Sequence, residues 1–118
     1  MEERRRFIRV SLVAKVTNMA TKEHHFFHSR DISQGGIFLE TKEPYPVGTE
    51  VELDFFLSFP DRKERIVVRG RVVRVQPFDM HTMEEKTPGM GVAFLNLSEA
   101  DLSRMESFVR EILYESLS

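Results

Sequence analysis

The chain has 118 residues, of which 41% are apolar and 31% charged, and it contains no cysteine. This length fits one globular domain, which we expect to span residues 1–118. The lack of cysteine excludes disulfide scaffolds, thiol catalysis and thiolate zinc sites. No apolar run approaches the ~20 residues of a membrane span, and no signal peptide follows the charged N-terminus. We therefore expect a cytoplasmic protein that makes no membrane contact.

The formal net charge is −2, which argues against a general polyanion-binding protein. Two segments are nevertheless basic, residues 1–9 and residues 62–74. Local basic segments in an acidic chain favour a local anionic ligand over a long nucleic-acid track. The second segment could be a solvated strand face, one wall of a ligand site, or a nucleic-acid contact. It lacks the Phe and Tyr side chains that would stack on bases, which disfavours nucleic acid as a partner.

Alternating apolar residues, or β-branched and aromatic content, predict strands in six segments. In chain order these are residues 8–18, 24–30, 37–41, 49–59, 65–75 and 90–95. The segment 49–59 alternates most clearly, with Val51 and every second residue to Phe59 on one face. Gly70 interrupts the fifth strand and predicts a bulge or a barrel corner there.

The connections and the C-terminal segment have different patterns. Residues 44–48 are rich in proline and glycine and predict a turn, and residues 76–89 have no periodicity and predict a long loop. Ser98 and the acidic residues that follow it predict a helix start, and the helix is expected over residues 98–117. Apolar residues at helical spacing form one stripe along this helix. It consists of Leu102, Met105, Val109, Ile112 and Leu113.

Six strands followed by one helix, without β-α-β alternation, predict an all-β fold. We expect a six-stranded antiparallel barrel of split or Greek-key type over residues 8–96, with the helix C-terminal to it. The helix could cap the barrel or form the seam of a homodimer, and a single stripe does not decide between these.

Two short motifs stand out, one at the start of the first predicted strand and one directly after the second. Arg5 and Arg9 form an R-x-x-x-R pattern, and residues 31–36 read D-x-S-x-x-G. In this order and spacing the sequence resembles the PilZ domain family, whose members bind the bacterial second messenger cyclic di-GMP. Residues 69–74 and 89–94 are similar to the last strands of that family, so the resemblance covers essentially the whole chain.

The resemblance implies a cyclic di-GMP site with defined residues. Its members are Arg5, Arg9, Asp31, Ser33 and Gly36, with Arg4, Arg6 and Gly35 as auxiliary candidates. A guanidinium fork can bind phosphate or the O6 and N7 atoms of guanine. The Asp31 carboxylate can accept hydrogen bonds from guanine N1–H and N2–H₂. We expect Gly36, and Gly35 with it, to adopt a positive φ and let the backbone approach the ligand.

The implied function is non-catalytic: a receptor that passes the signal to an effector protein by conformational change. The simplest switch would be an arm, residues 1–6, that folds over the ligand. Two other classes remain open, a ligand-independent interaction module and a nucleic-acid-binding barrel.

Catalytic and metal sites are not expected, and neither is a cofactor. On one strand His24 and His28 would lie ~13 Å apart, too far to chelate one ion, and His25 would face the other way. His81 lies in the predicted long loop. His28, Asp31 and Ser33 are triad residue types, but nothing in the pattern holds a base against a nucleophile.

Overall fold

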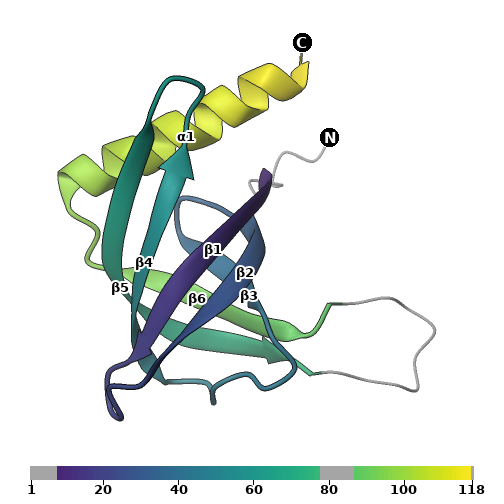
Figure 1. Ribbon diagram of the computed structural model, residues 1–118, viewed down its shortest axis with the longest axis vertical. Coiled ribbons are helices and arrows are strands. Elements are labelled where there is room, and N and C mark those ends of the chain that lie inside the picture. The colour runs from purple at the N-terminus through teal and green to yellow at the C-terminus, as the bar shows by residue number, and fades with distance from the viewer. Residues whose placement is uncertain (1–7, 78–86, 118) are drawn as a thin grey trace.

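The structure is a computed structural model that describes the backbone of residues 8–77 and 87–117. Side chains are described for residues 11–77 and 87–111. The described ranges contain six strands and one helix (Figure 1). The elements are β1 Ile8–Asn18, β2 His24–Ile32, β3 Gly36–Glu40, β4 Glu50–Ser58, β5 Lys63–Gln76, β6 Gly89–Leu95 and α1 Glu99–Leu117. No helix in these ranges is long and apolar enough to cross a bilayer.

The strands form a closed barrel in the order β1-β2-β3-β6-β5-β4. All neighbouring strands are antiparallel. Two meanders, β1-β2-β3 and β4-β5-β6, are joined edge to edge by the β3–β6 and β1–β4 pairings, so each of the six described strands is paired on both sides. The prediction of a six-stranded antiparallel barrel followed by a helix is confirmed.

The alternating strand residues fill the barrel interior. On β4 the inward side chains from Val51 to Leu57 are at most 1% exposed, whereas Glu50 and Glu52 face solvent. Ala14 and Val16 of β1 are also fully buried. The two-residue period of the sequence therefore identified which face of these strands forms the core.

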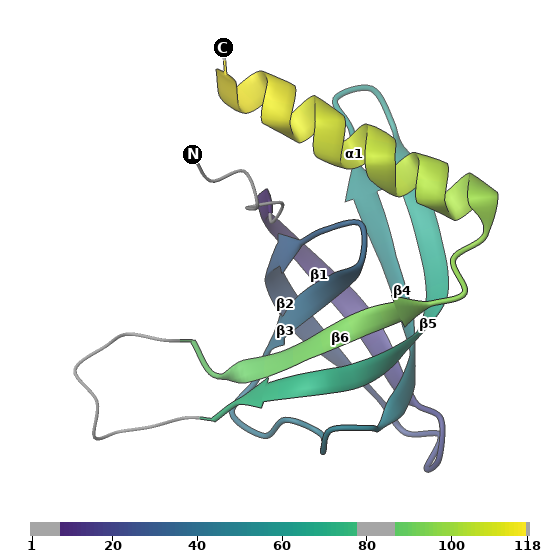
Figure 2. The ribbon, with the colours of Figure 1, turned by 180° about the vertical axis from the view of Figure 1, so that it is seen from behind.

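The helix closes one end of the barrel beside the β4–β5 hairpin (Figures 1 and 2). The Ser98 hydroxyl accepts a hydrogen bond from the Asp101 N–H at 3.0 Å, which confirms the predicted N-cap. Met105 and Phe108 are buried, and the Phe108 ring meets Phe59 edge-on at 5.6 Å. Packing of this face against the barrel shows that the helix caps it.

The helical stripe was predicted only in part. Met105 and Val109 are buried as expected, but Leu102 is 39% exposed and Phe108, which the stripe omitted, is 3% exposed. Leu102 lies in the first turn of α1, which begins at Glu99. The side chains of Ile112 and Leu113 lie outside the described residues.

The prediction of a bulge at Gly70 is wrong, because the bulge lies three residues later in β5. Gly70 pairs regularly on both sides, and the register of β5 against β6 shifts only between Val72 and Arg74. A Cβ atom on Gly70 would lie 2.6 Å from Cγ1 of Val92. Gly70 therefore provides room for close packing inside the barrel, and Val73 is the extra residue of the bulge.

Candidate ligand-binding site

Strand pairing brings one residue of each motif, Arg9 and Asp31, into one row across the barrel wall. On the first pair of strands, Arg9 of β1 is opposite Asp31 of β2. Asp31 is in turn opposite Phe38 of β3. Phe38 and Arg74, the latter on β5, are both opposite Gly91 of β6. We call these five residues the transverse row. It joins residues that are up to 82 positions apart in the sequence, from Arg9 to Gly91.

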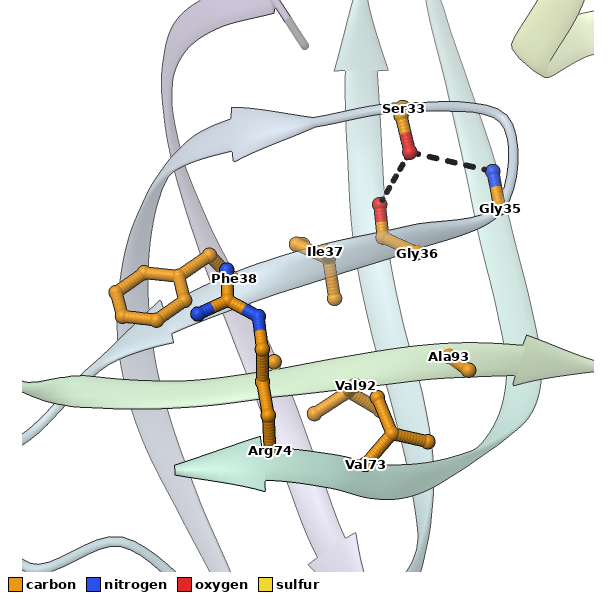
Figure 3. Close-up of a pocket in the computed structure, with 10 residues that line it drawn as sticks. Ser33, Gly35, Gly36, Ile37, Phe38, Val73, Arg74, Val92 and Ala93 are labelled. Atoms are coloured by element: carbon orange, nitrogen blue, oxygen red, sulfur yellow. Dashed lines mark hydrogen bonds between the residues drawn. The ribbon is translucent and has the colours of Figure 1, made fainter. Parts of the chain in front are cut away.

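The turn from β2 to β3 carries the second motif at one side of this row (Figure 3). The Ser33 N–H donates to the Gly36 carbonyl at 2.9 Å. The Ser33 hydroxyl donates to the same carbonyl at 3.4 Å and accepts from the Gly35 N–H at 3.3 Å. The Gly35 carbonyl accepts from the Phe94 N–H of β6 at 2.9 Å. Ser33 thus holds the turn in shape, and the Gly35–Phe94 bond fixes the turn to β6.

The expected positive φ at Gly35 and Gly36 is wrong. Among the described glycines only Gly48 has a positive φ, of 98°. Gly36 is the first residue of β3, and a Cβ atom on it would lie 2.5 Å from the Val92 carbonyl oxygen. A Cβ atom on Gly35 would meet nothing within 4 Å. Gly36 is therefore required for the close approach of β3 to β6, a reason that involves no ligand.

Two adjoining hollows lie on the outer surface along the transverse row. The first, of about 200 Å³, lies between the turn at Ser33 and strands β3, β5 and β6 (Figure 3). The second, of about 260 Å³, is lined by Asp31 and by polar side chains of β2, β3 and β5. Phe38 and Arg74 line both hollows and so form the wall between them. The motif residues Asp31 and Ser33 thus lie on opposite sides of one divided site.

Charges of both signs surround the second hollow. Arg30 and Glu40 form an ion pair at 3.3 Å across β2 and β3. The Arg74 guanidinium carbon lies 5.3 Å from the centre of the Phe38 ring, within the range of a cation–π contact. Carboxylates, guanidinium groups and an aromatic ring therefore line one hollow.

The basic segment 62–74 is not a continuous track of free charge. Three of its arginines form ion pairs with carboxylates of the same sheet. These pairs are Arg62–Glu64 at 2.7 Å, Arg65–Asp54 at 2.7 Å and Arg71–Glu50 at 2.9 Å. Hydrogen bonds from Arg65 lower the pKa of Asp54, so this pair is charged near neutral pH. The pairing reduces the charge available for a phosphate backbone.

Several predicted site residues lie outside the described residues. They are Arg4, Arg5 and Arg6, within the expected arm of residues 1–6. His81, which was not expected to bind a metal, also lies outside the described residues. For Arg9 the structure describes the backbone alone, which places it in the transverse row. The exposed His24, His25 and His28 lie along β2. In the described part of the chain, no three potential metal ligands among His, Asp and Glu lie together.

The sequence and the fold match one family of known proteins. The model of the PilZ domain matches residues 3–111. This chain belongs to the PilZ domain family. No curated protein sequence matches it significantly.

Solved PilZ structures and their relatives have the same fold at low sequence identity. The PilZ domain of YcgR from Escherichia coli, solved with c-di-GMP, is 19% identical with a TM-score of 0.65, over 97% of this chain and 95% of that one. The inhibitor of motility MotI from Bacillus subtilis is 17% identical with a TM-score of 0.71, over 98% of this chain and 52% of MotI. MrkH, a c-di-GMP-dependent transcription regulatory factor, is 18% identical with a TM-score of 0.66, over 92% of this chain and 50% of MrkH. This PilZ chain thus spans about half the length of MotI and MrkH.

Sequence reasoning missed one residue of the candidate site in this PilZ domain and left another undecided. Phe38 lies in a predicted strand, and no motif gave it a role at the site. Arg74 belongs to the basic segment, for which a wall of the ligand site was one interpretation, and the structure places it in that wall. The local sequence does carry a signal for Phe38, since it alternates with the buried Ile37 and Leu39 and must face outward.

Proposed function

We propose that this PilZ domain is a non-catalytic receptor for cyclic di-GMP that passes the signal to a protein partner by conformational change. The observation that carries the proposal is the pairing of Arg9 with Asp31. Arg9 of the R-x-x-x-R pattern thus lies next to Asp31 of the D-x-S-x-x-G turn, as a shared ligand requires.

The chemistry of the site matches the chemistry of this ligand. Cyclic di-GMP carries two phosphates and two guanines. Arg5 and Arg9 supply cations for the phosphates, and Asp31 supplies the acceptor for guanine N1–H and N2–H₂. Each hollow, of about 200 or 260 Å³, is smaller than the ~300–1,000 Å³ of a typical ligand pocket, but together they reach it. The function implies a cytoplasmic location, which is part of the proposal.

Two similar proteins support the choice of ligand. The PilZ domain of YcgR was solved with c-di-GMP, and MrkH is a transcription regulatory factor that depends on c-di-GMP. Both have the fold of this chain at under 20% identity, so the ligand is carried over as a proposal and rests on the motif residues.

Calorimetric titration with cyclic di-GMP tests the proposal, with GTP and single-stranded RNA as control ligands. We expect saturable binding of cyclic di-GMP alone. Asp31→Ala should weaken it about ten- to a hundredfold, the value of a hydrogen bond to a charged group. Asp61→Ala is the matched control, because Asp61 is exposed and lies in the β4–β5 turn, bonded to Arg62. Absence of cyclic di-GMP binding by the wild type would refute the function.

One observation favours a ligand-independent interaction module as the second candidate. Four large apolar side chains on β1, β2, β4 and β5 are 43–66% exposed: Val13, Phe26, Phe56 and Val67. Exposed apolar side chains in one region are typical of protein contact surfaces. This alternative predicts partner binding that is the same with and without cyclic di-GMP, whereas the receptor function predicts that the nucleotide changes it.

A further inference from the structure

The bulge in β5 turns Arg74 from the barrel interior to its outer surface. From Ile66 to Val72 every second residue of β5 is buried, so regular alternation would place Arg74 in the core. The extra residue, Val73, shifts the alternation by one position. Arg74 is therefore exposed, and Val75 packs against the core in its place. Bulges commonly redirect a side chain in this way near functional sites.

The neighbours of Arg74 allow its side chain to extend along the transverse row, over β6 and toward β3. Gly91 lies opposite it on β6, and a Cβ atom there would lie 3.0 Å from Cγ and 3.1 Å from Nε of Arg74. The absence of that Cβ lets the arginine lie over β6 and reach the Phe38 ring of β3 (Figure 3). Within the described residues no carboxylate forms an ion pair with Arg74, unlike the paired Arg65 and Arg71.

The second hollow therefore has groups of opposite polarity. It is lined by Asp31 from β2 and by Arg74 from β5, and Phe38 lines it from the strand between β2 and β6. A carboxylate accepts hydrogen bonds only, and a guanidinium donates them only. Guanine has N1–H and N2–H₂ donors on one edge and O6 and N7 acceptors on the next, so its polarity matches both groups.

We propose that Arg74 is a specificity residue that selects guanine by donating to its O6 and N7 atoms, while Phe38 provides a face for the base. The inference rests on the proposed function and extends it to residues outside both motifs. Adenine has an N6–H₂ donor where guanine has O6, so it would oppose the Arg74 donors. Planar guanidinium donors pair with two acceptors at once, which an ammonium group cannot do with the same geometry.

The test uses the full chain and two ligands, cyclic di-GMP and its analogue with 7-deazaguanine in place of both guanines. The analogue lacks N7 and keeps O6, N1–H and N2–H₂. The wild type should bind the analogue several-fold more weakly. Arg74→Ala should bind cyclic di-GMP about ten- to a hundredfold more weakly than the wild type, and should no longer distinguish the two ligands.

Two further variants isolate the guanidinium fork. Arg74→Lys keeps the charge and should lose discrimination as Arg74→Ala does. Arg69→Ala removes an equal charge from an exposed position of β5 that lines neither hollow, and should behave as the wild type. If Arg74→Ala keeps the wild-type ratio of affinities for cyclic di-GMP and the analogue, the inference is overturned and the receptor function is unaffected. A wild type that binds neither ligand would refute the receptor function itself.

Discussion

Substitution of Gly36 by alanine tests the close approach of β3 to β6. The added Cβ atom would lie 2.5 Å from the Val92 carbonyl oxygen, and contacts below 3.0 Å essentially never occur. Because that oxygen belongs to the backbone of β6, it cannot rotate away, and β3 must move by about half an ångström. Overpacking of this kind costs about 1–3 kcal/mol, partly offset by the ~0.4–1 kcal/mol that alanine gains by restricting the unfolded chain.

The expected net loss is about 1–2 kcal/mol, or a fall in melting temperature of about 4–8 °C for a chain of this size. Thermal and urea unfolding without ligand measure it. Gly35→Ala is the matched control, because a Cβ atom there meets nothing within 4 Å and the φ of Gly35 is not positive. Equal melting temperatures for Gly36→Ala and Gly35→Ala would refute the packing argument and return Gly36 to a role at the ligand alone.

Three further predictions concern the ligand arginines, one ion pair and the helix. Arg5→Ala or Arg9→Ala should each weaken cyclic di-GMP binding about ten- to a hundredfold in calorimetry, and unchanged affinity in both would remove them from the site. Arg65→Ala should lower stability at pH 7, because hydrogen bonds from Arg65 depress the pKa of Asp54. The difference in stability between the wild type and Arg65→Ala should be fully present above pH ~4 and should vanish as the pH falls through the lowered pKa of Asp54. An equal difference at pH ~2.5 and pH ~7 in thermal unfolding would contradict this explanation. Phe108→Ala should cost about 3–5 kcal/mol in urea unfolding, since the ring is buried against Phe59; a loss below ~1 kcal/mol would mean that the helix does not complete the core.

The strands and the helix start were predictable because their signals are local. Alternation along residues 49–59 depends only on which side of one strand is buried. The Ser98 cap depends only on the first turn of the helix that it begins. Local signals also identified the two motifs, since each occupies no more than six consecutive residues.

The helical stripe shows that local periodicity does not decide which apolar residues of α1 are buried. Periodicity grouped Leu102 with Met105, but only the contact between α1 and the barrel decides how far the packed face extends. Phe59 of the β4–β5 connection selects Phe108 as its partner. A residue that lies far away in the sequence thus determines which apolar side chains of α1 are buried.

The tertiary structure alone decided the geometry of the site. Register between distant strands places Asp31, Phe38 and Arg74 in one row, and no single segment contains this information. The bulge at Val73 reverses the direction that local alternation predicts for Arg74, because it arises from pairing with β6. Gly36 likewise is glycine because the Val92 carbonyl of another strand lies beside it, a constraint that exists only once β3 and β6 have paired.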